Sequence, residues 1–321
     1  MIMLQLLVWL YESPTIRNIV FLVGVFYLLR FMIWLLLSLW SGTKAFFLAG
    51  LFRVVDLKSY GWAVVTGASD GIGKEYAIQL AKHGVNVVLV ARSVEKLRAV
   101  EKEILDQFNV EVRIVIADFS KTDIYDEISS QLSGMEIGIL INNVGVAYDM
   151  PDYFLNVPEE KLWQLINVNM TSTVMMTKIV MPGMVDRKKG IVVNVSSATA
   201  LSPIPLMNIY CATKIFMDYF STALRYEYSD KGIIVQSVMP FFVATKLSGI
   251  QQSSFTVPAP KKFVCDALAT VGIQNRTFGT LSHALQVIPF SILPDWLIAK
   301  ITLRVLSNLR MAVIRMKQKM Q

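Results

Sequence analysis

The sequence predicts an α/β fold, in which a doubly wound parallel sheet is preceded by a transmembrane helix and followed by a membrane-associated helical extension. Two features of the chain predict it: short aliphatic runs alternate with helical stretches, and a long apolar segment comes before them. Apolar residues make up 54% of the 321 residues and charged residues only 17%, so the chain is more apolar than an ordinary soluble domain. This length is enough for one large α/β domain with extensions.

The segment Ile19–Trp40 is long enough to cross a bilayer as one helix, since its 22 residues span about 33 Å and the hydrocarbon core is about 30 Å thick. Arg30 lies at its middle, and a central arginine costs about 2.5–3.5 kcal/mol. The fifteen Ile, Val, Leu and Phe residues of the segment contribute up to roughly 4.5–9 kcal/mol, which outweighs that cost. We therefore expect the segment to insert into the membrane, as a spanning helix or as a shallow hairpin.

Basic residues are distributed unequally around this segment. Only Arg17 precedes it closely, whereas Lys44, Arg53 and Lys58 follow it. Because cytoplasmic flanks are enriched in lysine and arginine, the asymmetry predicts that the main domain faces the cytosol.

From residue 61 onward, runs of strand length alternate with helices, as in a parallel sheet that is covered on both faces. The predicted strands are Trp62–Val65, Val87–Val90, Val112–Ile116, Ile137–Ile141, Ile191–Val195 and Ile233–Val238. Helices are predicted over Lys74–His83 and Val94–Phe108, and Ser93 is a candidate N-cap for the second. The predicted domains are an anchor (1–52), the sheet domain (53–260) and a C-terminal extension (261–321).

The C-terminal part of the chain contains several kinds of sequence. Ser248–Pro260 is polar and is predicted to be a loop, whereas Ala284–Ile298 is apolar but interrupted by two prolines, which argues against a clean membrane span. From Lys300 onward, apolar positions alternate with basic ones. This pattern predicts a basic amphipathic helix that lies on a membrane surface or packs on the core of the protein itself.

A glycine-rich turn follows the first predicted strand. Residues 66–73 read TGASDGIG, and their three glycines allow a tight turn and a close approach to a pyrophosphate at a helix N-terminus. In this position, such a turn is typical of Rossmann-like dinucleotide-binding domains. The residues predicted to contact the dinucleotide here are Gly67, Ser69, Asp70, Gly71, Ile72 and Gly73.

The ends of the next strands add further candidate cofactor contacts. An NAD-binding fold usually places an acidic residue after the second strand, but here Ala91 holds that position and Arg92 follows it. Arg92 can pair with a 2′-phosphate, which favours NADP(H); a solvated residue at a strand end is the alternative. Asp118 is predicted either to accept from the adenine amino group or to cap the following helix. After the fourth strand, Asn143 and Gly145 are predicted to line the cofactor.

Three residues form a candidate catalytic set. Tyr210 and Lys214 are one turn apart if residues 207–228 are helical, and Ser197 lies thirteen positions before the tyrosine. A tyrosine with a pKa of about 10 exchanges protons poorly at neutral pH, but an ammonium group one turn away favours the phenolate and lowers that pKa. The pair is therefore a candidate general acid/base, with Ser197 holding a substrate oxygen. The alternative is a chance pair on the surface.

In this order and spacing, the motifs between about residues 60 and 250 resemble the short-chain dehydrogenase/reductase family. The resemblance implies that Tyr210 exchanges a proton with the substrate and that Ser197 orients the substrate oxygen. Lys214 would lower the pKa of the tyrosine and bind the nicotinamide ribose. Asn169 would hold a water molecule that links Lys214 to solvent.

The same resemblance extends to the segment after the sixth strand. It implies that Pro240, Val243 and Thr245 contact the nicotinamide end of the cofactor. One position departs from the family pattern, because Phe241 stands where glycine often follows the proline.

Further stretches resemble the microsomal 17β-hydroxysteroid dehydrogenase and very-long-chain 3-oxoacyl-CoA reductase group of this family. These stretches are Glu136–Leu140, Tyr153–Leu155, Pro182–Val185 and Phe242–Leu247. The resemblance implies an NADPH-dependent enzyme that is anchored in the endoplasmic reticulum membrane, with its catalytic domain in the cytosol. Lys317 and Lys319 fit a K-x-K-x-x retrieval pattern, for which an ordinary basic tail is the alternative.

The leading hypothesis is therefore NADPH-dependent reduction of a long-chain 3-oxoacyl-CoA in fatty acid elongation. The alternative substrate is a steroid, with interconversion of 17-keto and 17β-hydroxy forms. A non-catalytic membrane scaffold with a reductase fold is disfavoured, because Tyr210 and Lys214 are both present. The expected partners are the apolar substrate, the membrane, other fatty acid elongation enzymes and a second copy in a homodimer.

Charge and cysteine content narrow the classes further. The net charge is +7, but no run of basic and aromatic residues indicates nucleic-acid binding, so a membrane surface or an anionic small molecule explains the excess. Two cysteines, Cys211 and Cys265, do not indicate a disulfide framework. No metal site is predicted.

Overall fold

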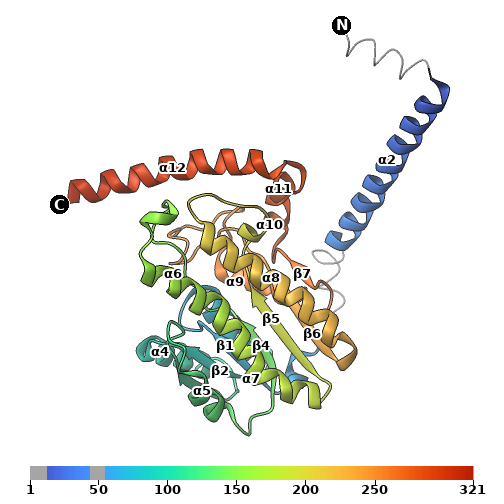
Figure 1. Ribbon diagram of the computed structural model, residues 1–321. Coiled ribbons are helices and arrows are strands. Elements are labelled where there is room, and N and C mark those ends of the chain that lie inside the picture. The colour runs from blue at the N-terminus through green and yellow to red at the C-terminus, as the bar shows by residue number, and fades with distance from the viewer. Residues whose placement is uncertain (1–12, 44–54, 321) are drawn as a thin grey trace. The chain divides into compact units, whose positions relative to one another are not determined.

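The computed structural model describes residues 13–43 and 55–320, which are drawn as ribbons in Figure 1. The chain divides into two compact units, Met1–Leu51 and Phe52–Gln321. The second unit contains both the sheet and the C-terminal helices. The predicted domain boundaries after residues 52 and 260 remain predictions.

The first unit contains helix α2 (Pro14–Thr43). Its part Pro14–Ile33 has a mean hydropathy of 1.9 and none of it is buried, so it is long and apolar enough to cross a membrane. The same helix contains the predicted segment Ile19–Trp40, which begins five residues after Pro14 and ends seven residues after Ile33. Lys44 and Arg53, used to predict the orientation of the helix, lie outside the described residues.

Among the described residues, the second unit contains a seven-stranded parallel sheet in the order β3-β2-β1-β4-β5-β6-β7. The strands are β1 (Trp62–Thr66), β2 (Asn86–Ala91), β3 (Val112–Ile116), β4 (Ile137–Asn142), β5 (Gly190–Val195), β6 (Ile233–Val238) and β7 (Arg276–Thr277). The chain reverses its direction of winding beside β1, so the doubly wound fold and the six predicted strands are confirmed. The strand β7 was not predicted, because two residues cannot form an apolar run.

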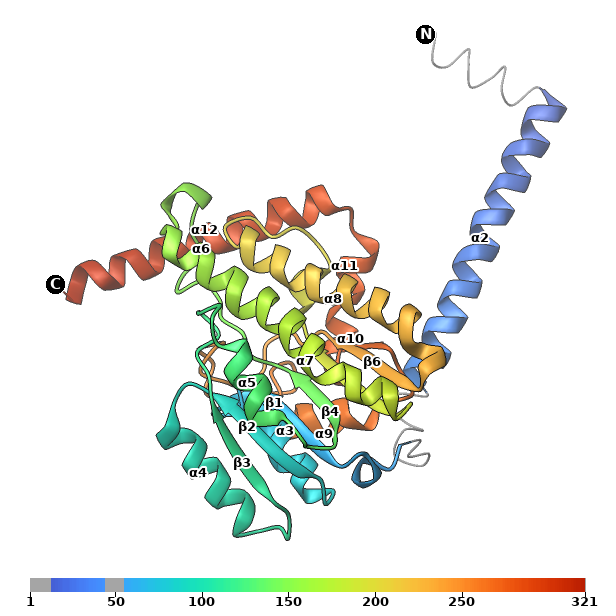
Figure 2. The same ribbon diagram turned by 60° about the horizontal axis from the view of Figure 1, so that its bottom comes forward.

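Helices cover both faces of the sheet (Figures 1 and 2). One core contains side chains of α3 (Gly71–Lys82), α4 (Val94–Leu105) and α9 (Pro260–Ala269). The other contains side chains of α5 (Tyr125–Leu132), α7 (Ser172–Asp186) and α8 (Asn208–Tyr228). Ala63 and Val65 of β1 enter the first core and Val64 enters the second, because successive strand residues point to opposite faces.

Two predicted helices, Lys74–His83 and Val94–Phe108, have different bounds in the structure. Helix α3 begins at Gly71 because the Asp70 carboxylate accepts a hydrogen bond from the Gly71 N–H at 2.8 Å. Helix α4 ends at Leu105, where Asp106 begins a turn that closes with a Phe108 N–H to Ile104 carbonyl bond. Ser93 holds the N-cap position of α4, but its side chain makes no capping hydrogen bond.

The C-terminal segment folds as three helices, α10 (Leu281–Gln286), α11 (Ile288–Ile292) and α12 (Asp295–Met320). The basic helix begins five residues before the predicted start, directly after Pro294. It contacts the sheet domain through an Arg310–Asp152 ion pair at 2.8 Å, yet it leaves Ile301, Val305 and Leu309 exposed. The side chains of Lys317 and Lys319, on which the retrieval-signal prediction depends, lie outside the described residues.

Candidate active site

Helix α8 positions the candidate acid/base pair. Its buried side chains include Cys211, Lys214, Met217 and Leu224, at helical spacings that turn one face toward the sheet. Tyr210 and Lys214 therefore stand one turn apart, as the spacing predicts, with the Lys214 Nζ 5.8 Å from the centre of the Tyr210 ring.

The Lys214 ammonium group is buried at the end of β5. Its Nζ donates to the Val195 carbonyl at 3.1 Å and lies 3.6 Å from the Met217 sulfur. Only 4% of the residue is exposed. Burial penalises the charged form and lowers the pKa of Lys214 from 10.5 to about 8.

The pKa of Tyr210 departs from the sequence-based expectation. Burial raises it to about 12, although a hydrogen bond with the Ser197 hydroxyl acts in the opposite direction. The lysine does not lower it here, because its ammonium group is directed at the Val195 carbonyl. Tyr210 is therefore a neutral phenol at neutral pH, which is the form that donates a proton.

Ser197 lies directly after β5, where the chain leaves the sheet. Its hydroxyl bonds with Tyr210 and accepts from the Thr199 N–H at 3.2 Å at the start of a short helical turn, Ala198–Ala200. The neighbouring Ser196 hydroxyl donates to the Lys214 carbonyl at 2.6 Å, which fixes this segment to α8. The structure thus brings together the serine and tyrosine that were paired by spacing.

Asn169 is fully buried in a π-helical turn, Asn167–Thr171, between α6 (Glu159–Ile166) and α7. Its amide accepts from the Val146 N–H at 2.8 Å and donates to the Val146 carbonyl and the Thr213 hydroxyl, both at 3.0 Å. A Cβ placed on Gly145 would lie 3.4 Å from both the Asn169 Oδ1 and the Lys214 Nζ. The asparagine and the lysine therefore meet beside Gly145, and such π-turns are frequent at functional sites.

The glycine turn has the geometry expected of a phosphate-binding loop. Gly67 and Gly71 have positive φ angles of 66° and 57°, which other residues rarely adopt. A Cβ on Gly73 would lie 2.3 Å from both the Asn143 Nδ2 and the Gly67 carbonyl oxygen, so only glycine lets α3 approach β1 this closely. The N-terminus of α3 consequently lies close to the carboxyl end of β1, and the backbone N–H groups of a helix N-terminus can bind an anion.

A cleft of about 260 Å³ lies at the carboxyl ends of β1, β2 and β4. The predicted cofactor residues that line it are Gly67, Ser69, Asp70, Gly71, Ile72, Arg92, Asp118, Asn143, Gly145 and Thr245. Five predicted cofactor residues do not line the cleft, namely Gly73, Tyr210, Lys214, Pro240 and Val243, and the last three of them are buried. Lining residues that were not predicted to contact the cofactor are Ala91, Ala117, Phe119, Val144, Val146, Gln164, Val168, Lys246 and Leu247.

Charged side chains surround the cleft. The exposed Lys246 forms a 3.0 Å ion pair with Asp70, and Arg92 is exposed after β2. Burial opposes ionisation of Asp118, but hydrogen bonds from Ser120 and the positive charge of Arg92 together hold the Asp118 pKa below its usual value. Asp118 bonds to Ser120 and does not cap α5, whose N-cap position is residue 124, so the capping alternative is wrong.

An aromatic cluster explains the phenylalanine that follows Pro240. The Phe241 ring lies 6.0 Å from the imidazole of His283 and 5.6 Å from the ring of Phe290. His283 is fully buried, with Nε2 3.1 Å from the Phe242 carbonyl oxygen and Nδ1 3.3 Å from that of Phe278. His283 therefore joins α10 to the segment beside the cleft, a role that sequence reasoning missed.

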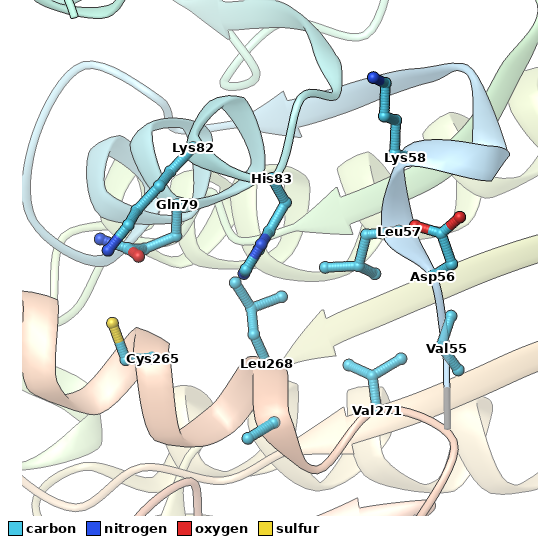
Figure 3. Close-up of a pocket in the computed structure, with 11 residues that line it drawn as sticks. Val55, Asp56, Leu57, Lys58, Gln79, Lys82, His83, Cys265, Leu268 and Val271 are labelled. Carbon is cyan, nitrogen blue, oxygen red and sulfur yellow. The ribbon is translucent and has the colours of Figure 1, made fainter. Parts of the chain in front are cut away.

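A larger cavity of about 450 Å³ lies between α3, α9 and the residues before β1 (Figure 3). Gln79, His83 and Cys265 border it, and burial raises the pKa of the Cys265 thiol. Neither cavity is lined by Ser197, Tyr210 or Lys214, but the smaller cleft contains residues of the glycine turn and also Gly145, which lies beside Lys214. The smaller cleft is therefore the candidate cofactor site, and the Ser–Tyr–Lys set adjoins it.

A parallel sheet with a glycine turn, next to a serine, a tyrosine and a buried lysine, defines a nicotinamide-dependent oxidoreductase. Residues 61–254 match the family described as short chain dehydrogenase. The chain belongs to this family.

Individual relatives agree with this assignment. A human protein named very-long-chain 3-oxoacyl-CoA reductase is 49% identical over 260 residues, which cover 80% of this chain and 83% of that protein. Human inactive hydroxysteroid dehydrogenase-like protein 1 is 44% identical over 283 residues, which cover 86% of each chain. The structure of a Sphingobium yanoikuyae short-chain dehydrogenase in complex with NADPH is similar with a TM-score of 0.63 and 32% identity, over 68% of this chain and 86% of that one.

Proposed function

We propose that this chain reduces the keto group of a very-long-chain 3-oxoacyl-CoA to a hydroxyl with NADPH. The observation that carries the proposal is the Ser197–Tyr210 hydrogen bond beside the buried Lys214. A protonated tyrosine next to a second hydroxyl is what reduction of a ketone needs. The named substrate comes from relatives that are 48–49% identical to this chain.

Each catalytic group has one task in this proposal. The Ser197 hydroxyl donates to the ketone oxygen and holds it near the tyrosine. Tyr210 transfers its proton to that oxygen as negative charge develops there. Bound NADPH supplies the hydride that reaches the carbonyl carbon. Lys214, whose pKa is about 8, then gives a proton back to the tyrosine, which restores the phenol.

Two features of the cleft suit the phosphate groups of NADPH. The glycine turn leaves no room for a Cβ at Gly73 and exposes the N-terminus of α3. Arg92 and Lys246 are cationic side chains at the rim, and Arg92 directly follows β2, the strand after which such folds recognise the adenosine ribose. We therefore expect NADPH to be preferred over NADH, with Lys214 and Tyr210 at the nicotinamide end beside Thr245.

Substrate panels test the proposal. The full-length chain in detergent or vesicles should oxidise NADPH in the presence of long-chain 3-oxoacyl-CoA. If the chain reduces 17-ketosteroids and no acyl-CoA, the substrate is a steroid and the acyl-CoA proposal is wrong. If the chain binds NADPH but reduces neither acyl-CoA nor steroid substrates, a non-catalytic protein is favoured, as the name of one relative, inactive hydroxysteroid dehydrogenase-like protein 1, suggests.

The cellular setting is also part of the proposal. We infer anchoring in the endoplasmic reticulum membrane through α2, with the catalytic unit in the cytosol. Other fatty acid elongation enzymes and a second copy of the chain are the expected protein partners. Support comes from the apolar α2 and from the very-long-chain substrate, whose acyl part partitions into a bilayer.

A further inference from the structure

The segment from α10 to the start of α12 presents an apolar surface that is uncharged up to the exposed Asp295, which accepts a hydrogen bond from the Ser202 hydroxyl at 2.6 Å. Between Leu281 and Pro294 the only titratable side chain is His283, which is fully buried. The exposed large side chains of this α10–α11 surface are Leu281, Leu285, Ile288, Ile292, Leu293 and Trp296. Ile292 is 70% exposed and Trp296 is 67% exposed. Clustering of this kind marks an interaction surface, because scattered single residues would need no explanation.

This surface is continuous with the mouth of the catalytic cleft. The Gln286 amide of α10 donates to the Thr256 carbonyl at 3.0 Å, and the adjacent Phe255 is 72% exposed. Leu247, which lines the cleft, is 61% exposed. Together with the His283–Phe242 contact, this bond fixes α10 to residues 242 and 256, which lie in sequence on either side of the cleft-lining residues 245–247.

Charge and length indicate what covers the surface. Helix α12, which follows directly, carries six basic residues and one acidic residue, so two copies of the chain would repel each other here, whereas an anionic lipid surface would attract it. The stretch Leu281–Ile292 spans about 18 Å as a helix and is broken before Pro289, so it is too short to cross a core of about 30 Å. Trp296, in the first turn of α12, follows this stretch, and tryptophan is enriched at membrane interfaces.

We propose that the α10–α11 surface docks shallowly in a phospholipid bilayer and thereby turns the mouth of the catalytic cleft toward the membrane. The acyl chain of the substrate then enters from the lipid while its polar CoA end stays in water. The docking depends on the surface alone, whereas this substrate route rests on the proposed function.

Lipid quenching tests the docking without any activity measurement. In full-length chain with Cys265→Ser, which removes the exposed thiol, a fluorophore is placed at Ile292→Cys and, as a control, at Leu105→Cys. Leu105 is 50% exposed and lies at the end of α4. In vesicles of phosphatidylcholine and phosphatidylserine with brominated acyl chains, we expect quenching at 292 and none at 105. Equal weak quenching at both positions, or cross-linking of two copies through position 292, would overturn the proposal.

Paired charge substitutions test the substrate route. The variant Ile292→Glu/Trp296→Glu should lower kcat/KM for a long-chain 3-oxoacyl-CoA delivered in vesicles about tenfold or more, because it removes two large apolar side chains from the lipid. A short, water-soluble 3-oxoacyl-CoA should be reduced at the parental rate, and Leu105→Glu should change neither rate. An equal loss on both substrates, or no loss on either, would refute the route. If the parental chain reduces neither substrate, the proposed function fails, but the quenching result still decides the docking.

Discussion

Tyr210 is the residue on which proton transfer depends most directly, because burial keeps it protonated and Ser197 fixes its hydroxyl. Tyr210→Phe removes the hydroxyl and keeps the ring, so we expect kcat to fall by about 10²-fold or more with little change in NADPH binding. Steady-state kinetics and NADPH fluorescence titration measure the two effects. Tyr219→Phe, at a 68% exposed position of the same helix, is the matched control. Full activity of the Tyr210 variant would exclude the mechanism.

Lys214 should make the stability of the fold depend on pH. Its pKa falls from 10.5 in the unfolded chain to about 8 in the folded protein, so between these values the unfolded state binds more protons and stability rises with pH. Below pH 8 the folded state bears the full cost of the buried charge, roughly 3 kcal/mol. Lys214→Met should therefore be inactive but more stable than the parent at pH 7.

The size of this stabilisation should decrease as the pH rises from 8 toward 10. Thermal unfolding of both proteins at neutral and at alkaline pH measures it. A difference in melting temperature that does not change with pH would show that the lysine is not the titrating group.

Arg92 should decide between the two nicotinamide cofactors. Arg92→Asp replaces a cation at the expected 2′-phosphate position by an acidic group, which suits a ribose hydroxyl. We expect KM for NADPH to rise by about 10–100-fold, as for loss of a charge-assisted hydrogen bond, while KM for NADH stays equal or falls. Arg98→Asp on the exposed face of α4 controls for net charge. An unchanged preference for NADPH over NADH would show that Arg92 is a solvated side chain that does not contact the cofactor.

At the scale of elements, the glycine turn joins β1 to α3 with no spare room. Gly73→Ala would place a methyl group 2.3 Å from the Gly67 carbonyl oxygen and the Asn143 amide, so α3 would have to move. We expect loss of NADPH binding and a lower melting temperature. Gly183→Ala is the matched control in α7, because its Cβ meets only the flexible end of Arg187 at 3.2 Å. Equal effects of the two changes would contradict the close-packing argument.

The sheet could be predicted from the sequence because each buried strand is a short aliphatic run of its own. The ends of helices were less accessible, since the start of α3 depends on one Asp70 hydrogen bond and β7 consists of only two residues. In the site, Ser197, Tyr210 and Lys214 could be grouped because strand ends and one helical turn fix their spacing. Lys246 and His283 could not, because their contacts with Asp70 and Phe242 join segments far apart in the chain.

The pKa of Tyr210 marks another limit of sequence reasoning. Spacing predicts that a lysine lies one turn away, but it does not predict the rotamer that directs the ammonium group to Val195, nor the burial that raises the pKa. The direction of a pKa shift therefore depends on packing, which only the folded chain supplies.

At the scale of the whole molecule, the unequal distribution of basic residues leads to a prediction about orientation. Lys44, Arg53 and Lys58 follow α2 closely in sequence, and positive flanks stay on the cytosolic side. In sealed microsomes that contain the full-length chain, a C-terminal epitope should therefore be removed by added protease without detergent, while a lumenal marker stays intact. Detergent, which opens the vesicles, should add cleavage of the marker only. An epitope protected until detergent is added would place the catalytic unit in the lumen and would separate it from the cytosolic supply of acyl-CoA that the proposed reaction requires.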